Sequence, residues 1–476
     1  MFTKRTAQQH EFEFVNIENL VPEEHLLRGI DETINFDFIY DKVKHLYSTK
    51  TGRPSIDSVV LFKMVLIQYL FGISSERKLI RQIKVNMAFR WFLGYKLTDK
   101  IPHHSVFSQN RRRRFTDSTI FKDIFETIVE QAIELGFIEG KVLYTDSTHI
   151  KASANKNKFD KITVEKKPSV FIDELNEDVT KEREDHDKKP FKQTEPKVET
   201  KITKQSRTDP DSGYMCRNKK PLGFFYLDHR TVDGQYNFIT DVFITPGNVN
   251  DSVPYLSRLD YQTKRFNFNV EAVGIDAGYN TAAICKGIVE RNIIGVIGYR
   301  RSSGKKGFYK KYRFRYNAEE DTFTCLADCI LSYKTTSRNG YSSYASDVDD
   351  CCNCSLRGKC ITAKSGIKTI TRHVWEDYKD IIKQNKKEDY GKEIYKRRQE
   401  TVERSFANAK QLHGYRYARL IGLEKVKFQA YMTATAQNVK KIAKLLKKRM
   451  INRGLLNIVD KAHHEANIKG NLQPIF

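Results

Sequence analysis

The chain has 476 residues, 39% of them hydrophobic and 30% charged, which is the composition of a folded protein and excludes an intrinsically disordered one. Its 83 Lys and Arg residues outnumber the 59 Asp and Glu residues, and the net charge of +24 favours nucleic acid as a partner, with general basicity as the alternative. No secretory signal is recognisable, so we expect a cytoplasmic protein.

Residues 1–135 are expected to form an all-helical domain. The segment 58–72 (SVVLFKMVLIQYLFG) is typical of a buried helix, and its short length and polar Lys63 and Gln68 argue against a membrane span. The segment 74–95 repeats apolar side chains at helical spacing and continues the same domain.

A run of arginines marks the end of the next predicted helix, which lies within residues 101–115 after a turn at Pro102. Four consecutive side chains point around the whole circumference of a helix, so they cannot all be neutralised from one side. This arrangement favours phosphate contact, and a solvated charged face is the alternative. The residues are Arg111, Arg112, Arg113 and Arg114.

Residues 136–300 change to strands alternating with helices. The first strand, residues 142–150 (VLYTDSTHI), carries Asp146 where a core side chain is expected. A charged insertion at residues 155–204 follows, and its apolar residues recur every fourth position, which predicts one amphipathic helix around Leu175.

A second set of strands follows this insertion. Residues 223–232 and 236–245 are predicted to form a hairpin around an Asp233-Gly234 turn. The elements predicted next are a helix from Asp251 toward Arg265, a strand over residues 270–276 that ends in Asp276, a further helix, and a strand over residues 293–300.

Residues 301–375 are predicted to form a basic insertion that contains most of the cysteines. Within it, residues 308–316 alternate basic and aromatic side chains, which predicts a strand that could press on DNA. Tyr312, Phe314 and Tyr316 would face one side of this strand, and Arg313 and Arg315 the other.

The cysteines of this insertion have the spacing of a structural zinc site. The proposed ligands are Cys325, Cys351, Cys354 and Cys360. Four thiolates favour tetrahedral Zn²⁺ without a catalytic role. Cys329 and Cys352 leave the choice of ligands open, and free thiols in a reducing cytosol are the alternative.

A late helix over residues 395–410 (YKRRQETVERSFANAK) carries an acid beside its apolar stripe. The stripe includes Val402 and Phe406, and Glu403 lies next to it. Lys410 follows two turns later on the same side.

Three acidic residues on separate predicted elements form the candidate catalytic set: Asp146, Asp276 and Glu403. Converging carboxylates suit Mg²⁺ or Mn²⁺, and two such ions about 3.5–4 Å apart can activate an attacking oxygen and stabilise a leaving one. Each aspartate has a local alternative, because Asp146 could bond nearby backbone and Asp276 could cap a helix. Glu400, one turn before Glu403, is the alternative third ligand.

At these residues the chain resembles the DDE transposases of bacterial insertion sequences. The resemblance rests on TDST around Asp146, GIDAGYN around Asp276 and TVERSFANAK around Glu403. It covers nearly the whole chain. GRPSIDSVVLFKMVLIQYLFGISSERKLIRQIKVNMAFRWFLG is similar to the helical amino-terminal domain of these enzymes, and TDPDSGYMCRNKKPLGFFYLDHRTVDGQYNFITDVFITPGNVNDS resembles the insertion-sequence eleven-eighty-two branch.

The resemblance implies an α/β fold with a ribonuclease-H-like mixed sheet flanked by helices, and a triad of Asp146, Asp276 and Glu403 that binds two Mg²⁺ or Mn²⁺ ions. The implied divisions are a helical DNA-binding domain at 1–135, the first part of the catalytic core at 136–300, a cysteine-containing insertion at 301–375, the rest of the core at 376–455 and a tail at 456–476.

A tyrosine–arginine–glutamate–lysine signature of related enzymes implies DNA contacts around the glutamate helix. Lys410 keeps the signature's distance from Glu403, whereas Arg398 is one residue further away, which turns a helix position by about 100°. The residues expected to contact DNA are Arg111, Arg112, Arg113, Arg114, Arg313, Arg315, Tyr395, Arg398 and Lys410.

The function implied is a transposase that binds the terminal inverted repeats of its element, cleaves the ends and transfers the 3′ ends to target DNA. Joining two ends implies a homodimer in the DNA complex, in the bacterial cytoplasm near the nucleoid. A non-mobile metal-dependent nuclease of the same fold and a catalytically dead, zinc-containing DNA-binding protein are the alternatives.

Overall fold

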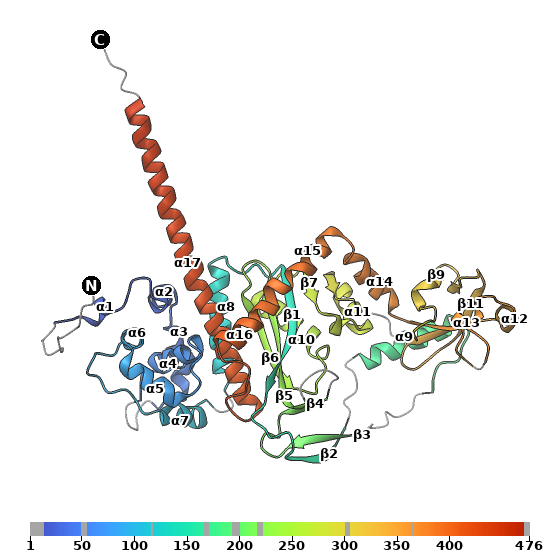
Figure 1. The fold of residues 1–476 in the computed structure, drawn as a ribbon, viewed down its shortest axis with the longest axis horizontal. Coiled ribbons are helices and arrows are strands. Elements are labelled where there is room, and N and C mark those ends of the chain that lie inside the picture. Colours follow the sequence, from blue (N-terminus) through green and yellow to red (C-terminus); the bar gives the residue numbers. More distant parts are fainter. Residues whose placement is uncertain are drawn as a thin grey trace, which may run out of the picture.

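The computed structural model describes residues 14–48, 55–115, 118–165, 171–192, 200–216, 222–299, 305–363 and 365–470, with side chains up to residue 452. The molecule combines a helical unit, a central sheet covered by helices, and a smaller β unit on the far side of that sheet (Figure 1). The predicted mixed α/β class is therefore confirmed.

The amino-terminal unit is helical, as predicted. Its central helix, α4, is buried on nearly all sides because almost every residue is apolar, and Asp57 caps its first turn by accepting from two backbone N–H groups. The helical run over residues 74–95 is split, because Asn86 ends α5 and caps α6. The elements are α1 (Ile17–Leu20), α2 (Leu26–Thr33), α3 (Phe38–Val43), the 3₁₀ turn η1 (Lys44–Leu46), α4 (Ser58–Leu70), α5 (Glu76–Val85), α6 (Met87–Phe92), α7 (Ser105–Arg113) and α8 (Ile120–Glu134).

The central sheet mixes antiparallel and parallel pairs. Its strand order is β6-β5-β1-β7-β8, with short β4 pairing beside β6 on the same edge of β5. β5 pairs antiparallel with both β6 and β1, whereas β1, β7 and β8 run parallel to one another. The bounds are β1 (Val142–Lys151), β4 (Gly213–Met215), β5 (Gly223–Asp233), β6 (Ile239–Pro246), β7 (Ala272–Ile275) and β8 (Ile294–Ile297), so the predicted 223–245 hairpin is confirmed.

Helices from several parts of the chain cover this sheet. α8, α10 and α17 pack on β6, whereas α11, α14 and α15 pack near β8. The long α17 also contacts α2, α4 and α8, so the helical unit and the sheet share one hydrophobic core. The bounds are α10 (Tyr255–Phe266), the 3₁₀ turn η2 (Ala277–Tyr279), α11 (Ala282–Glu290), α14 (Glu376–Asn385), α15 (Asp389–Arg397), the π-helical turn η4 (Gln399–Glu403), α16 (Arg404–Leu412) and α17 (Leu423–Gly470).

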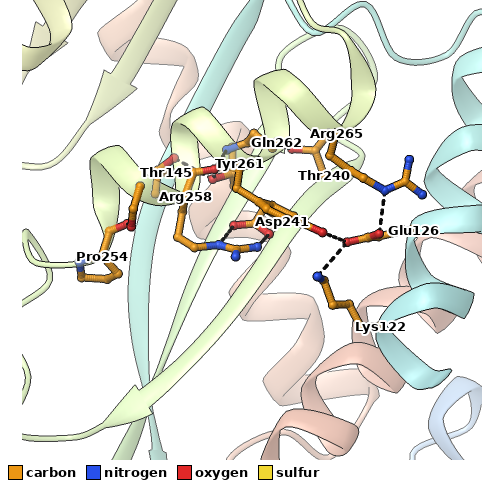
Figure 2. A network of polar contacts seen from close by, with 12 residues as sticks. Lys122, Glu126, Thr145, Thr240, Asp241, Pro254, Arg258, Tyr261, Gln262 and Arg265 are labelled. Carbon is orange, nitrogen blue, oxygen red and sulfur yellow. Dashed lines mark hydrogen bonds and ion pairs between the residues drawn. The ribbon is translucent and has the colours of Figure 1, made fainter. Parts of the chain in front are cut away.

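A polar network ties α8, α10 and the sheet together (Figure 2). Glu126 of α8 accepts from Tyr261 and pairs with Arg265 of α10, with its Oε2 2.8 Å from Arg265 Nε. Arg258 of α10 pairs in turn with the buried Asp241 of β6. Burying these charges is tolerable because each has a partner.

The smaller β unit is an antiparallel sheet in the order β13-β12-β11-β10-β9, with its own core around Phe314, Phe323 and Tyr344. The strand predicted over residues 308–316 is confirmed at its end alone, where Arg315 and Tyr316 belong to β9, and is wrong for the residues before it. Residues 311–313 form a 3₁₀ turn, and Phe314 enters the core while Tyr312 remains exposed. The bounds are η3 (Lys311–Arg313), β9 (Arg315–Asn317), β10 (Thr322–Thr324), β11 (Ile330–Thr336), β12 (Tyr341–Ser346), α12 (Val348–Cys352), α13 (Arg357–Cys360) and β13 (Thr369–His373).

The charged insertion forms a two-stranded ribbon of β2 (Phe159–Glu165) and β3 (Thr200–Ser206) and the predicted amphipathic helix, α9 (Ile172–Glu184). α9 lies between the central sheet's helices and the smaller β unit (Figure 1). Asp178 of α9 pairs with Lys286 of α11 at 2.8 Å, and His186 beyond its end pairs with Asp321 at 2.7 Å. None of the described helices combines the length and apolar character needed to cross a bilayer.

Candidate active site

The three candidate carboxylates lie together at one end of the parallel strands. Thr145 of β1 is opposite Ile275 of β7, so Asp146 and Asp276 occupy the next position on neighbouring strands. Glu403 ends the π-helical turn η4, which packs against β1 and β5. Residues far apart in the chain are thus brought to one place.

The guanidinium of Arg398 joins these carboxylates. Its Nη1 lies 3.2 Å from Asp146 Oδ2, and its Nη2 lies 3.7 Å from Asp276 Oδ1 and 2.6 Å from Glu403 Oε1. Arg398 is buried, with 8% of its surface exposed. Arg398 was expected on DNA phosphate, and the structure places it among the acids instead.

The π-helical turn explains how Arg398 reaches Glu403. In a regular α-helix a residue five positions away is turned off the shared face, whereas a π turn holds one extra residue and restores the alignment. Residues 399–403 form this turn. The extra residue between Arg398 and Glu403 is therefore absorbed locally.

Burial and charge both act on Asp146. Burial raises the pKa of Asp146 from 3.8 to about 6; Arg398 and the Ser147 backbone N–H oppose this rise, while Asp276 and Glu403 add to it. The strand itself is held from its other face, where Thr145 Oγ1 lies 2.8 Å from Thr231 Oγ1, and Gln262 of α10 donates to Thr231.

Glu403 rather than Glu400 takes part in this cluster. Glu400 is exposed, and its side chain makes no ion pair among the described residues. A pair with Arg404 is therefore not formed either. The backbone oxygen of Glu400 accepts a bond from Asn237.

Two further residues of the signature lie near the carboxylates. Lys410 of α16 donates to Thr148, which lies two residues after Asp146 and so on the same face of β1. Tyr395 is half-buried, and Lys386 lies 3.7 Å from its ring centroid. Burial and the charge of Arg398 lower the pKa of Lys386, against the effect of Asp276.

A group of buried polar atoms beside the carboxylates escaped the sequence analysis. Tyr279, which follows Asp276, has its pKa raised well above 10 by burial and by the charges of Asp146 and Asp251. The hydroxyl of Tyr279, the hydroxyl of Tyr255 and Asp251 Oδ1 are all buried and have no hydrogen-bond partner among the described residues. Such atoms in native proteins are satisfied by water, so we expect ordered water behind Asp276.

Of the four consecutive arginines, two are partly buried and two are exposed. Arg111 pairs with Glu76 at 2.5 Å, and Arg114 lies over the Tyr47 ring at 4.3 Å. Arg112 and Arg113 are exposed. Arg111 and Arg112 line a cavity of about 1020 Å³ between α7, α8 and the start of α17, which Lys122, Lys425 and Lys427 also line.

The other arginines expected to contact DNA lie on the smaller β unit, away from the carboxylates. Arg313 is exposed at the end of the 3₁₀ turn. Arg315 is exposed as well and pairs with Asp328 at 2.7 Å.

Five cysteines lie close enough in the smaller β unit for their charges to interact, and none of them forms a disulfide. They are Cys325, Cys329, Cys351, Cys354 and Cys360. Burial, followed by the charges of Cys325 and Asp350, raises the pKa of Cys329 to about 11, and burial also raises the pKa of Cys360. Cys352 is exposed. In the described part of the chain, no three of these sulfur atoms lie within 4.8 Å of one another, so the zinc site expected from the sequence is not assembled in the structure, and Cys325 and Cys329 still compete for one position.

Hard oxygen donors make the three carboxylates suitable for Mg²⁺ or Mn²⁺. Within the described part of the chain, however, the group whose ligand atoms all lie within 4.8 Å of one another is Glu182, His186 and Asp321. The candidate triad is wider because its members surround a guanidinium.

Two family models match the chain. Residues 15–113 match the model described as Transposase domain (DUF772), and residues 324–443 match the model described as Transposase DDE domain. The second match includes Glu403, Lys410 and the cysteine cluster, but neither Asp146 nor Asp276. The chain is thus similar to two transposase models, which together cover less than half of its length.

Three solved structures show low overall similarity. A piggyBac transposase synaptic complex with hairpin DNA is 10% identical with a TM-score of 0.32, over 95% of this chain and 86% of that one. A Mos1 transposase paired-end complex with left transposon end is 11% identical (TM-score 0.16; 53% of this chain, 61% of that one). A Mos1 mariner paired end complex with Mn is 12% identical (TM-score 0.16; 54% and 65%). No curated protein sequence matches the chain.

Proposed function

We propose that this protein is a transposase of an insertion sequence, close to the insertion-sequence eleven-eighty-two branch. It binds the terminal inverted repeats, cleaves the element ends and transfers the 3′ ends to target DNA. The observation that carries this proposal is the convergence of Asp146, Asp276 and Glu403 on one buried cation. The strand order β6-β5-β1-β7-β8 supports a ribonuclease-H-like core.

In this proposal the three carboxylates hold two Mg²⁺ or Mn²⁺ ions. When bound, the ions would activate the attacking oxygen and stabilise the leaving one in phosphodiester displacement. The β1–β7 pair positions Asp146 and Asp276, and η4 brings Glu403 to them. Lys410, which donates to Thr148, would contact a phosphate next to the reacting bond.

Positive side chains elsewhere would bind the DNA backbone. The helical unit, residues 1–135, would bind the element end through the exposed Arg112 and Arg113 and the basic cavity beside them. The set proposed to contact DNA remains Arg111, Arg112, Arg113, Arg114, Arg313, Arg315, Tyr395, Arg398 and Lys410. The net charge of +24 supports such contacts, and pairing of two ends requires a homodimer in the DNA complex.

A structural zinc ion would complete the smaller β unit within the insertion 301–375. The presence of Cys325, Cys329, Cys351, Cys354 and Cys360 in this one small unit supports this, because closely spaced cysteines are the usual ligands of structural Zn²⁺. Metal analysis of the purified protein is expected to find one zinc per chain. A purified protein without zinc would contradict the zinc site.

The decisive experiment incubates the purified protein and Mg²⁺ with linear DNA that carries the element's ends. We expect cleaved and joined products from the unchanged protein and none from Asp276→Asn, although that variant still binds the DNA. Asp260→Asn, a change at an exposed aspartate of α10, is the matched control and should remain active.

The other outcomes identify the alternatives. Cleavage without joining would indicate a nuclease of the same fold. Binding without cleavage by either protein would indicate a DNA-binding protein with an inactive catalytic domain.

A further inference from the structure

Arg398 occupies the centre of the site that, on the proposed function, holds the metal ions. Its two terminal nitrogens lie between 2.6 and 3.7 Å from oxygens of Asp146, Asp276 and Glu403. The carboxylates come from three different elements, so this one side chain holds the site together without metal. A solvent-exposed arginine could not do so, and Arg398 is buried.

Arg398 and a pair of divalent ions cannot occupy this position together. Magnesium requires oxygen ligands at about 2.0–2.1 Å in nearly octahedral geometry. The guanidinium instead donates to Asp146 and Glu403 and lies 3.7 Å from Asp276, and its positive charge repels a metal ion at close range. Metal loading therefore requires the guanidinium to leave.

The surroundings of Arg398 allow such a movement. The residue directly precedes the π-helical turn η4, a conformation that is rare and occurs frequently at functional sites. Lys386 lies beside Tyr395, near enough for the charge of Arg398 to lower its pKa and for the charge of Asp276 to oppose this, so a second cation already lies near Asp276. Repulsion between these two cations favours release once the carboxylates bind metal.

The displaced guanidinium suits one partner in particular. Its planar fork of N–H donors binds phosphate through two parallel hydrogen bonds. DNA phosphate is the partner that the proposed reaction brings to this site together with the metal ions. Arg398 would thus exchange the carboxylate oxygens for phosphate oxygens.

We propose that Arg398 is a built-in counter-cation that occupies the metal position in the free protein and transfers to DNA phosphate when DNA and metal load. It therefore couples the two binding events. Free protein binds divalent metal weakly, and DNA raises the affinity for metal. By linkage, metal raises the affinity for DNA by the same factor.

A direct test is to measure Mn²⁺ binding to the protein without DNA, with electron paramagnetic resonance as the method. Arg398→Gln is expected to bind Mn²⁺ at least tenfold more tightly than the unchanged protein. Arg398→Lys, which keeps a charge but cannot bridge three carboxylates, should show a smaller increase. Arg404→Gln removes an equal charge from an exposed neighbour and should change the affinity less than twofold.

Thermal unfolding provides a readout that does not depend on activity. Without metal, Arg398→Gln should unfold at a lower temperature than the unchanged protein because three carboxylates lose their cation, and Mn²⁺ should restore most of the loss. If Arg398→Gln does not fold without metal, Arg398→Lys serves for both measurements.

The outcomes separate this inference from the proposed function. Equal Mn²⁺ affinity in the unchanged protein and both Arg398 variants would overturn the role of Arg398 alone. Absence of Mn²⁺ binding by the unchanged protein, with and without DNA that carries the element's ends, would overturn the proposed function itself.

Discussion

Arg230 is a charged residue completely enclosed by the core, directly opposite Asp146 in the β1–β5 pair. Its Nη2 lies 2.7 Å from Asp228 Oδ2, and its Nη1 donates to Ser405 and Gln437. The bonds to Ser405 and Gln437 tie β5 to α16 and α17. A buried pair of this kind is costly to break because the remaining charge has no solvent.

We expect Arg230→Met to lower the free energy of unfolding by about 3–5 kcal/mol, since Asp228 would be left buried and uncompensated. Urea unfolding measures this. Arg207→Met, which removes an exposed arginine from a pair with Asp160, should change stability little. Replacing Arg230 by Met and Asp228 by Leu together should recover most of the loss, and failure to recover would show that the packing of Arg230 matters more than its charge.

The candidate carboxylates could be selected from the sequence because each is a charge beside apolar residues. Asp146 interrupts a strand in which Leu143, Tyr144 and Ile150 are fully buried. Glu403 lies beside Val402 and Phe406, which are buried as well. The place of Arg398 could not be selected in the same way. Regular helical spacing turns Arg398 away from Glu403, and only tertiary packing of η4 against the sheet brings them together.

Among the elements, the long apolar and amphipathic segments were predictable, and the short irregular ones were not. α4 and the β5–β6 hairpin follow from pattern and turn chemistry. The expected strand over residues 308–316 is confined to its last two residues, because residues 311–313 form a 3₁₀ turn that alternation alone cannot reveal. α10 starts at Tyr255 rather than at Asp251, after a turn.

The π-helical turn predicts an unusual tolerance to deletion. Removing Glu400 should convert η4 to a regular α turn and leave Arg398 and Glu403 four residues apart on one face. The protein should then fold and still cleave element-end DNA. Loss of cleavage by a folded protein without Glu400 would instead support Glu400 as a ligand.

A deletion in regular helix serves as the control. Removing Asn408 from α16 should turn Lys410 by about 100° away from Thr148 and abolish cleavage. Thermal unfolding of both deletion variants distinguishes loss of the site from loss of the fold.

The attachment of α9 to the smaller β unit should depend on pH. Burial lowers the pKa of His186, but its bonds to the Glu182 backbone oxygen and to Asp321 outweigh this and leave the pKa raised above 6.5. Protonated His186 therefore stabilises the folded state fully below about pH 6.5, and this contribution is lost as pH rises through the raised pKa.

Hydrogen exchange of α9, corrected for the intrinsic effect of pH, tests this expectation. Protection of α9 should fall between pH 6 and pH 9 in the unchanged protein and should be low and constant in His186→Gln. Protection in the unchanged protein that stays constant over this range would contradict the role of the His186–Asp321 pair.

At the scale of the whole molecule, α17 joins the helical unit to the sheet. Its buried residues extend from Val426 to Ala443, and Arg449 donates to the Leu135 backbone oxygen at 2.8 Å. Beyond that point Met450 and Ile451 are exposed. The first part of α17 is therefore core, and the helix continues past it (Figure 1).

Truncations should divide α17 at this point. A chain that ends at residue 452 should unfold at the same temperature as the 476-residue chain. A chain that ends at residue 440 loses Ile442 and Ala443 and should be less stable by about 2–5 kcal/mol, as for removal of a large buried side chain. Equal stability of the two truncated chains would contradict the packing seen for α17.

The position of α17 also decides when the protein can complete its core during synthesis. α2, α4 and α8 all lie before residue 135, whereas the helix that packs against all three begins at Leu423. At about 5–20 residues per second, a ribosome needs roughly 15–60 s to cover this distance. Throughout that time the surface of α4 that α17 later covers stays exposed. We therefore expect a nascent chain of this protein to depend on chaperones.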